Sequence, residues 1–222
     1  MEDIDAIALL QDPVRRRLYE YVVAQGREVG RNEAAEATGV ARTLAAHHLD
    51  RLAGAGLLES GSRRLTGRSG PGAGRPAKVY TRTPAERSVS LPARDYRTAA
   101  ELLAEAAEEA GLDAGLCAAA RRRGEALRGT DAPCGDLGAA LAALTARGYE
   151  PHLEEGGGGT RAVRMRNCPF HAVAERFPPL VCGMNLALLE GLLGTGGPLR
   201  ARMDARPGAC CVVVEPSKNN DD

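Results

Sequence analysis

The stretch ARTLAAHHLDRLAGAGLLES, residues 41–60, decides how the first part of the chain folds. Its apolar or half-apolar side chains recur at the spacing of one helix face, and they are Ala41, Leu44, Ala45, His48, Leu49 and Leu52. The opposite face is polar and consists of Arg42, Thr43, Ala46, His47, Asp50 and Arg51. We therefore expect an amphipathic helix that buries one face and offers the other to a partner.

The residues before this helix predict two more helices. Asp12 and Pro13 form a helix start, because Asp caps free amides and Pro suits the first helical turn. Apolar side chains then recur at helical spacing until Gly26 ends the run. An alanine-rich helix follows over residues 32–38, with a tight turn at Gly39. Two short helices joined by such a turn, the second with a polar outer face, are typical of a DNA-binding helix-turn-helix.

The sequence after residue 56 predicts two strands joined by a basic loop. LLES at residues 57–60 and AKVYTRT at residues 77–83 are strand-like, and residues 63–82 hold six basic residues and no acidic one. A basic hairpin directly after such a helix can lie along DNA phosphates. The candidate DNA-binding residues are therefore Arg42, Thr43, Ala46, His47, Arg63, Arg64, Arg68, Arg75 and Lys78. We expect the partner to be double-stranded DNA with a palindromic operator, bound by a homodimer.

Three segments of this region, DPVRRRLYEYV, LAAHHLDRLAGAGLLE and GRPAKVYTRT, carry a family resemblance. Together they resemble the ArsR-type winged helix-turn-helix of bacterial transcription regulators. The resemblance covers residues 5–85 and implies a winged helix-turn-helix DNA-binding domain, which we expect over residues 1–88. It is a weak guide to the regulated gene.

Charge is distributed unevenly over the 222 residues, although the net charge is zero. Residues 1–98 hold 16 basic and 12 acidic side chains, and residues 99–222 hold 13 basic and 17 acidic ones. A basic front part is typical of a segment that meets a polyanion. The N-terminus lacks the features of a secretory signal, and no apolar run reaches membrane-spanning length. We therefore expect a cytoplasmic protein without a membrane partner.

The whole chain predicts a mainly α fold with an α+β C-terminal part. Residues 89–130 are rich in Ala, Leu and Glu and predict a helical connector, which either pairs with its copy in a dimer or packs on its own domain. Residues 131–216 predict a sensor domain that closes as β-β-α-α-β-β, with the glycines 156–159 as a hairpin turn. Residues 217–222 are expected to form a disordered tail.

The segment RNCPFHAVAERFPPLVCG, residues 166–183, carries two thiols beside expected helix starts. Cys168 is expected at the N-cap of one helix, and Cys182 just before a second helix that begins at residue 184. Free amides and the positive end of a helix favour a thiolate at such positions. In a cytoplasmic protein, these thiols are more typical of ligands or switches than of structural disulfides.

A third thiol can come from Cys210 or Cys211, which are adjacent in PGACCVVVE. Successive strand side chains point to opposite faces, so only one of the two can join a site with the other thiols. We expect Cys210, with Cys211 as the alternative. His171, three residues beyond Cys168, is the expected fourth ligand, and water, a small thiol or Glu175 are its alternatives.

The spacing of these thiols bears on the metal that they could hold. Zinc sites usually contain two close Cys-x2–4-Cys pairs, and the sequence has no such pairs. Single, widely spaced thiolates favour an iron–sulfur cluster, because such a cluster takes its ligands from separate elements. Zinc binding, or a thiol switch without a metal, stays the alternative. Cys117 is expected in a helical core, and Cys134 has no expected role.

The segments RNCPFHAVAERFPPLVCGMNLALLEGLL and PGACCVVV, behind an ArsR-type winged helix, resemble the SufR-like transcription regulators. In that family three C-terminal cysteines bind an iron–sulfur cluster, and the cluster-bound protein represses iron–sulfur assembly genes. The resemblance implies that Cys168, Cys182 and Cys210 are the ligands and that the cluster is of the 4Fe–4S type, with one iron left for another ligand. The sequence departs from the family in a first gap that is one residue longer and in the adjacent pair of Cys210 and Cys211.

An enzyme is the other class of function to consider. The sequence has no Gly-rich strand-to-helix phosphate loop and no Ser, His and Asp arrangement, and its four histidines leave few groups for acid–base chemistry. We therefore expect no enzymatic activity. The expected function is a transcriptional repressor whose operator affinity follows a Cys-ligated iron–sulfur cluster that senses iron or redox status. The alternative is a zinc-binding or thiol-switch winged-helix regulator.

Overall fold

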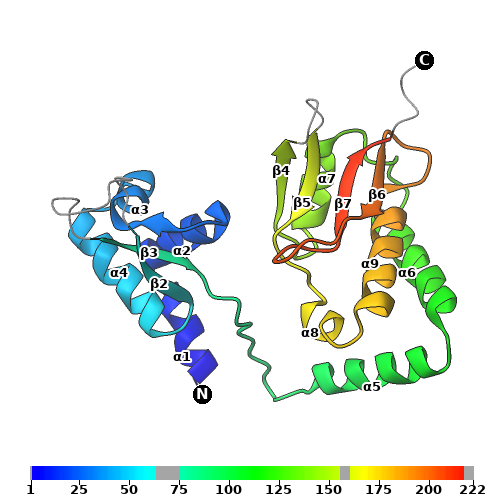
Figure 1. The fold of residues 1–222 in the computed structure, drawn as a ribbon, viewed down its shortest axis with the longest axis horizontal. Helices are drawn as coiled ribbons and strands as arrows, with labels where there is room; N and C mark the ends of the chain where they lie inside the picture. Colours follow the sequence, from blue (N-terminus) through cyan, green and yellow to red (C-terminus); the bar gives the residue numbers. More distant parts are fainter. Residues whose placement is uncertain (1, 64–75, 156–160, 218–222) are drawn as a thin grey trace. The chain divides into compact units, whose positions relative to one another are not determined.

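The computed structural model describes residues 2–63, 76–155 and 161–217 (Figure 1). The chain divides into two compact units, Met1–Arg94 and Asp95–Asp222. Each unit has its own antiparallel sheet and its own hydrophobic core. Outside the described residues lie the DNA-binding candidates Arg64, Arg68 and Arg75, the glycine turn at 156–159 and residues 218–222 of the expected tail.

The first unit begins with helices and ends with a hairpin. Its elements are α1 (Glu2–Ala8), a 3-10 turn (Leu9–Gln11), α2 (Pro13–Gln25), β1 (Val29–Gly30), α3 (Arg31–Thr38), α4 (Arg42–Gly54), β2 (Leu58–Arg63) and β3 (Ala77–Arg82). Asp12 caps α2 by accepting the amides of Val14 and Arg15. Gly39 ends α3 with a φ of 67°, a conformation that favours glycine, so the chain turns sharply into α4. The expected helices, turn and strands are confirmed, and β1 is an additional short strand.

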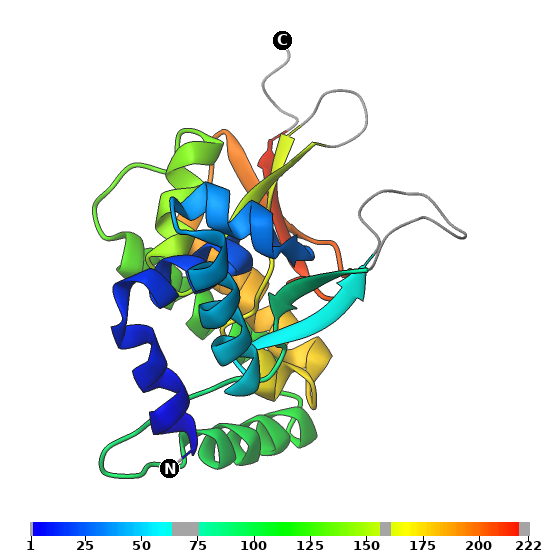
Figure 2. The ribbon, with the colours of Figure 1, turned by 90° about the vertical axis from the view of Figure 1, so that its left-hand side faces the viewer.

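The sheet of the first unit has the order β1-β3-β2, and its neighbouring strands are antiparallel. Strands β2 and β3 run side by side as a hairpin (Figure 2). Helix α4 buries Leu49 and Leu52 completely, and Tyr80 of β3 joins them in the core. Two expected core residues are wrong: Ala41 is exposed at the N-cap and Leu44 is 43% exposed, because the buried stripe of α4 begins at Ala45.

The second unit packs helices against a sheet. Its elements are α5 (Tyr96–Glu109), α6 (Asp113–Arg128), α7 (Leu137–Thr145), β4 (Pro151–Glu155), β5 (Arg161–Met165), α8 (His171–Ala174), α9 (Pro178–Leu193), β6 (Leu199–Met203) and β7 (Val212–Pro216). From β4 onward the order is β-β-α-α-β-β, as the sequence predicts. The antiparallel sheet has the order β4-β5-β7-β6. Helices α7 and α9 pack on it and bury Leu144, Val163, Leu189 and Val214 (Figure 1).

Helices α6 and α9 approach each other through glycines. A Cβ atom at Gly124 of α6 would lie 2.1 Å from the carbonyl oxygen of Leu188, and one at Gly191 of α9 would lie 2.2 Å from that of Arg121. Glycine is therefore required at both positions. Helix α5 contacts α8 and α9. The segment from α5 to α6 thus packs within the second unit, which agrees with the second of the two arrangements expected for residues 89–130.

The expected fold class is confirmed in its coarse form, as a mixed α/β fold with two small antiparallel sheets in the described residues. The boundary between the units follows Arg94 rather than residue 88. An ion pair of 2.7 Å from Arg87 to Asp3 of α1 holds the last part of the first unit in place. Among the helices that the structure describes, none is long and apolar enough to cross a membrane.

Candidate functional site

Four of the six cysteines come together in the second unit and form what we call the thiol cluster: Cys168, Cys182, Cys210 and Cys211. They come from three segments, which are the loop after β5, helix α9 and the loop before β7. All four are free thiols, and Cys210 is 1% exposed while the others are half-buried. Parts of the chain that are distant in sequence thus bring sulfur atoms side by side.

The sulfur atoms of the thiol cluster influence one another's protonation. Cys168 lies within hydrogen-bonding reach of Cys210, Cys210 of Cys211, and Cys211 of Cys182. Hydrogen bonding to Cys210, followed by burial, raises the pKa of Cys168 and of Cys211. The hydrogen bonds from these two thiols lower the pKa of Cys210. Cys210 is therefore the thiol of the cluster that its neighbours favour as a thiolate.

A buried polar chain continues from Cys210 into the core. The Nδ2 atom of Asn185 donates to the Cys210 sulfur at 3.4 Å, and the amide of Val212 donates to the same sulfur. Asn185 is fully buried, and its Oδ1 accepts the hydroxyl of Tyr149 at 2.5 Å. Burial raises the pKa of Tyr149, which keeps its hydroxyl protonated as a donor. Because the Cys210 amide also donates to the carbonyl of Met165 at 3.0 Å, this residue is fixed at both backbone and side chain.

The loop that carries Cys168 is fixed by Asn167. Its Oδ1 accepts the amide of Glu150 at 2.6 Å, and its Nδ2 donates to the carbonyl of Gly148 at 2.7 Å. The amide of Phe170 donates to the Cys168 sulfur. The side chain of Asn167 thus ties the end of β5 to the turn before β4 and sets where the Cys168 sulfur lies.

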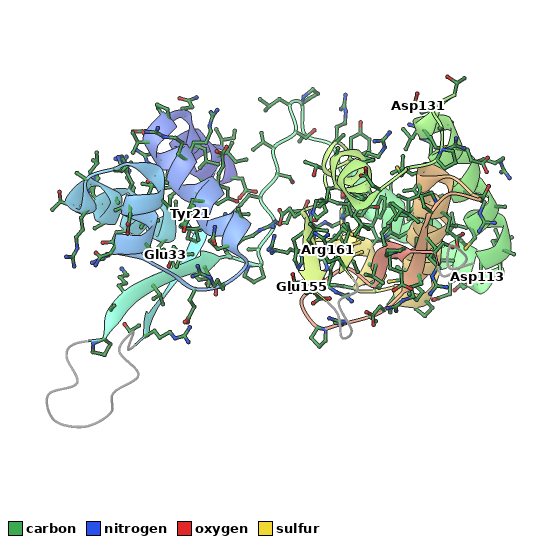
Figure 3. The ribbon with its side chains drawn as sticks, turned by 90° about the horizontal axis from the view of Figure 1, so that it is seen from above. Tyr21, Glu33, Asp113, Asp131, Glu155 and Arg161 are labelled. Carbon is green, nitrogen blue, oxygen red and sulfur yellow. The ribbon has the colours of Figure 1, made fainter. Side chains whose placement is uncertain are left out.

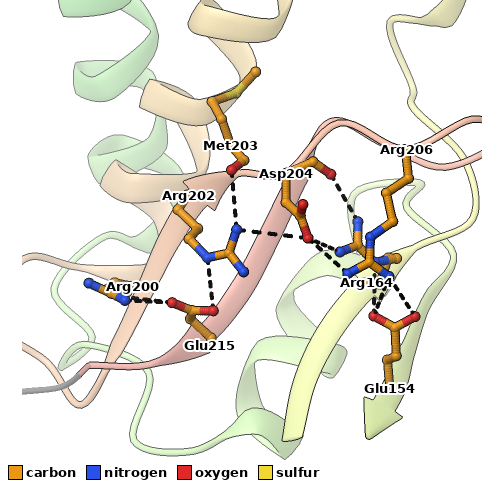
Figure 4. Close-up of polar contacts among 8 residues, drawn as sticks. All are labelled: Glu154, Arg164, Arg200, Arg202, Met203, Asp204, Arg206 and Glu215. Atoms are coloured by element: carbon orange, nitrogen blue, oxygen red, sulfur yellow. Dashed lines mark hydrogen bonds and ion pairs between the residues drawn. The ribbon is translucent and has the colours of Figure 1, made fainter. Parts of the chain in front are cut away.

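Cys211 lies in a loop that Arg164 anchors (Figure 4). Arg164 of β5 is buried and donates to the carboxylate of Glu154 at 3.1 Å. It also donates to the carboxylate of Asp204 and, at 3.1 Å, to the Asp204 carbonyl. The amide of Asp204 in turn donates to the carbonyl of Cys211 at 2.7 Å. Charged side chains of the sheet therefore fix the backbone that leads to the adjacent cysteines.

The two helix starts expected at the cysteines are wrong. Helix α8 begins at His171 with Phe170 as its N-cap, so Cys168 lies before the cap. Helix α9 begins at Pro178, because proline suits the first helical turn, and Cys182 therefore lies inside the helix. The argument that a helix end favours a thiolate does not apply to Cys182.

The expectation that only one of Cys210 and Cys211 can join the site is also wrong. Strand β7 begins at Val212, and both cysteines lie before it, at a bend. The alternation of side chains along a strand does not govern a bend. Both sulfurs therefore reach the thiol cluster.

His171, the expected fourth ligand, faces the surface. Its side chain is 64% exposed, and its Nε2 lies 3.2 Å from Glu175, which was an alternative for the same role. A Cβ atom at Gly183 of α9 would lie 3.6 Å from the Cys117 sulfur, so Cys117 belongs to the contact of α6 with α9. Cys134 is half-buried, and burial raises its pKa. The fourth sulfur beside the three expected cysteines is thus that of Cys211.

In the first unit, helix α4 presents the expected polar face. Arg42, Thr43 and His47 are exposed, and Ala46 is half-buried. Arg42 lines a groove between α3 and the hairpin of β2 and β3. Within the described residues Arg42 forms no ion pair.

Both acidic and basic side chains line this groove. Tyr21 of α2 and Glu33 of α3 face each other there, and the hydroxyl of Tyr21 donates to the Glu33 carboxylate at 3.3 Å (Figure 3). Arg27 pairs with the same carboxylate at 2.5 Å. Arg63, a DNA-binding candidate, lies 3.1 Å from Glu28. Most of the positive charge along the groove is therefore already matched by acids.

Asp50 ties α3, α4 and β3 together. Its carboxylate accepts hydrogen bonds from the hydroxyl of Tyr80 at 2.6 Å, from Lys78 at 2.7 Å and from Arg31 at 2.7 and 2.9 Å. Burial works against ionisation, but the hydrogen bonds outweigh it and lower the pKa of Asp50 to about 2. Burial and the bond to Asp50 raise the pKa of Tyr80 to about 12. Lys78, expected to contact phosphate, is thus part of this network.

Arg15 of α2 and His48 of α4 form a buried polar pair in the same unit. The Nε atom of Arg15 donates to the Nδ1 of His48 at 3.3 Å, and its Nη1 donates to the carbonyl of Leu9 at 3.0 Å. Burial lowers the pKa of His48. The neutral ring with an accepting Nδ1 therefore suits this position.

Sequence reasoning missed three of these residues. Asn185 shares an otherwise apolar helix with one other polar residue, Glu190, and Asp50 is the one acid on a helix face that carries Arg42, His47 and Arg51. Both are exceptions to a pattern, and such an exception is a usable signal because buried polar groups need partners. Arg164 sits in an alternating strand and carries no comparable signal.

Among the described residues, no group of three or more His, Cys, Asp or Glu side chains is arranged to hold a metal ion. The thiol cluster offers sulfur donors from separate elements, and this donor type suits iron–sulfur clusters. Comparison with known proteins finds no matching family model, no matching curated protein and no matching solved structure.

Proposed function

We propose that this chain is a DNA-binding transcriptional repressor whose operator affinity depends on an iron–sulfur cluster held in its second unit. The observation that carries the proposal is the convergence of four cysteine thiols, from three segments, in a unit joined to a helix-turn-helix unit. Sulfur donors from separate elements suit such clusters. The regulated genes would be those for iron–sulfur assembly or stress responses.

The DNA-binding part of the proposal rests on the order of elements in the first unit. Helices α2, α3 and α4 followed by the hairpin of β2 and β3 have the order of a winged helix-turn-helix. Helix α4 would enter the major groove with Arg42, Thr43, Ala46 and His47. Support comes from the exposed side chain of Arg42 and its lack of an ion pair within the described ranges. An unpaired guanidinium suits two hydrogen bonds to a guanine.

The cluster part of the proposal assigns Cys168, Cys182 and Cys210 as ligands and Cys211 as the fourth donor in place of His171. Ligation would replace the hydrogen bonds among the thiols, which are the interactions these groups now make. Cys210 is the best positioned of the four, because Asn185 and a backbone amide already orient donors at its sulfur. When bound, a cluster would supply a group that is sensitive to iron supply and oxidants.

The proposal includes a homodimer on a palindromic operator. Support comes from helix α5, which exposes three large apolar side chains. Tyr96 is 74% exposed, Leu103 is 72% exposed and Leu102 is 61% exposed. A single glutamate in place of Leu103 should therefore shift the protein from dimer to monomer in light scattering.

Anaerobic purification followed by iron, sulfide and zinc analysis tests the cluster. The expected result is a coloured protein with equal amounts of iron and sulfide, lost in each of Cys168→Ser, Cys182→Ser and Cys210→Ser. Cys117→Ser is the matched control, because that thiol lies in the helix contact outside the thiol cluster. A colourless wild-type protein that contains zinc would contradict the iron–sulfur cluster and support the zinc-binding alternative.

Operator binding tests the other half of the proposal. The Arg42→Ala variant should lose about 1–3 kcal/mol of binding free energy at the operator and discriminate less between bases. Arg63→Ala should weaken binding to all sequences and reduce the salt dependence. His171→Ala, an exposed change in the second unit, is the control. If the Arg42→Ala variant reads its operator normally, α4 is not the recognition helix.

A further inference from the structure

Three elements of the first unit meet at one carboxylate on the polar face of α4. Asp50 lies about two helical turns after Arg42 on that helix. Its Oδ1 accepts the hydroxyl of Tyr80 at 2.6 Å and the Nζ of Lys78 at 2.7 Å, and both donors belong to β3. Its two oxygens also accept the Nη2 of Arg31, in α3, at 2.7 and 2.9 Å. One side chain thus joins α4 to α3 and to the hairpin.

The surroundings of Asp50 require a group that only accepts hydrogen bonds. The buried Tyr80 hydroxyl accepts the Nε of Arg31 at 2.8 Å while it donates to Asp50. The Lys78 ammonium and the Arg31 guanidinium also lie 5.6 and 5.9 Å from the centre of the Tyr80 ring. The donors therefore contact one another as well as the carboxylate. An asparagine would place its own N–H groups against these donors and could not hold all of them.

The groups that Asp50 holds belong to the groove beside α4. Arg31 and Lys78 line this groove together with Arg42. The side chains of Asp50, Arg31 and Lys78 are all partly exposed. One carboxylate balances only one of the two cations, so the group keeps a net positive charge that attracts an anion. Asp50 therefore leaves the groove positive and fixes where its charge lies relative to Arg42.

We propose that Asp50 is a positioning residue for operator recognition, which holds α3 and β3 in a fixed place relative to α4. Phosphate contacts set the register of a protein on the duplex, and base contacts from the helix read the sequence. A hairpin released from α4 would let the helix meet the bases in more than one register. Asp50 thus contributes to the preference for the operator and not to the general attraction of DNA. The inference rests on the proposed DNA-binding function and is independent of the cluster.

The test compares two duplexes, an operator selected by the wild type from random-sequence DNA and an unrelated duplex of equal length. Fluorescence anisotropy gives the affinity of the full chain for each. In Asp50→Asn the affinity for the operator should fall about tenfold, the size of one lost base contact. The affinity for the unrelated duplex should stay the same or rise, because a negative charge is lost. A variant that is only partly unfolded would lose the same factor on both duplexes.

Glu59→Gln is the matched control, because it removes the same charge from an exposed position on β2 and should keep the wild-type ratio of the two affinities. Tyr80→Phe removes one hydrogen bond to Asp50 without a change in charge, and it should lower the ratio by a smaller factor. An unchanged ratio in both Asp50→Asn and Tyr80→Phe would overturn the inference alone. A wild type without any operator preference would overturn the proposed function, and this inference with it.

Discussion

Asp50 in the first unit and Arg164 in the second each connect segments within their own unit, and they do so with opposite charges. Asp50 is one acid surrounded by donors from α3 and β3, and its side chain is 43% exposed. Arg164 is one cation between Glu154 and Asp204, and its side chain is 4% exposed. Each residue connects its own element to the preceding one and to a segment farther along the chain. The two networks have opposite central charges and very different contact with water.

This difference indicates that the number of partners does not determine how much a polar network contributes to the free energy of unfolding. When an exposed ion pair is broken, both charges regain favourable contacts with water, so the pair contributes little to the free energy of unfolding. A buried charge cannot regain contacts with water in the folded state, so removing its partners leaves a charged group without compensation. Four substitutions in the two units test this ranking by the loss of unfolding free energy, from the largest expected effect to the smallest.

The Arg164→Met substitution should have the largest effect. We expect the second unit to lose about 3 kcal/mol of unfolding free energy in urea titrations of the reduced, metal-free protein. Arg206 pairs with the same two acids but is 49% exposed, so Arg206→Met is the control and should cost less than about 1 kcal/mol. Equal losses in the two variants would show that burial does not decide the ranking.

The Asn185→Leu substitution comes next, because it removes the centre of a neutral buried chain. We expect a loss of about 2 kcal/mol, since the Tyr149 hydroxyl loses its acceptor while it stays buried. The second substitution Tyr149→Phe, added to Asn185→Leu, should recover part of the loss. A double variant that is less stable than Asn185→Leu alone would contradict this account.

The Asp50→Asn substitution should cost about 1 kcal/mol, in keeping with its partial exposure. The folded state lowers the pKa of Asp50 from 3.8 to about 2, so the carboxylate stabilises the first unit above pH 3.8 and this contribution is lost as the pH falls to about 2. Urea titrations at several acidic pH values should show this loss in the wild type and a smaller one in Asp50→Asn. Glu59→Gln, an exposed change on β2, should keep the wild-type profile.

His48 should give the smallest effect, and it should appear only as a pH dependence. Burial lowers the pKa of His48 from 6.5 in the folded state. The neutral ring therefore contributes fully above pH 6.5, and the contribution is lost as the pH falls through the lower folded value. Thermal unfolding at mildly acidic and neutral pH should show this slope in the wild type and a flatter one in His48→Gln. An unchanged slope in the variant would assign the effect to another group.

Much of the fold could be predicted because local rules decide it. The cap at Asp12, the turn at Gly39 and the helical spacing in α4 each depend on residues close in sequence. The β-β-α-α-β-β order follows from the change in period along the second unit. The assignment of the segment from α5 to α6 to that unit could not be predicted, because it depends on helix contacts at Gly124 and Gly191.

The candidate site could be predicted in part. Cys182 and Cys210 both act on the pKa of Cys168, whereas the role of the three cysteines as ligands stays a prediction. Helix and strand ends were misjudged by a few residues, and this error made Cys211 an alternative to Cys210 instead of a second member of the same site. One residue at a strand end changes the face to which a side chain points, so a small error in a boundary becomes a large error in a site.

The contact of Gly124 with α9 and of Gly191 with α6 has a mechanical consequence. Backbone meets backbone there, so the joint contains no side chain whose rotation could absorb a shift. Helix α9 carries Cys182, and α6 follows directly on α5, the first helix after Arg94. A displacement of α9 caused by a change at Cys182 would therefore displace α6 by a similar amount. The pair of helices acts as a stiff joint, and an alanine at either glycine would force the joint open.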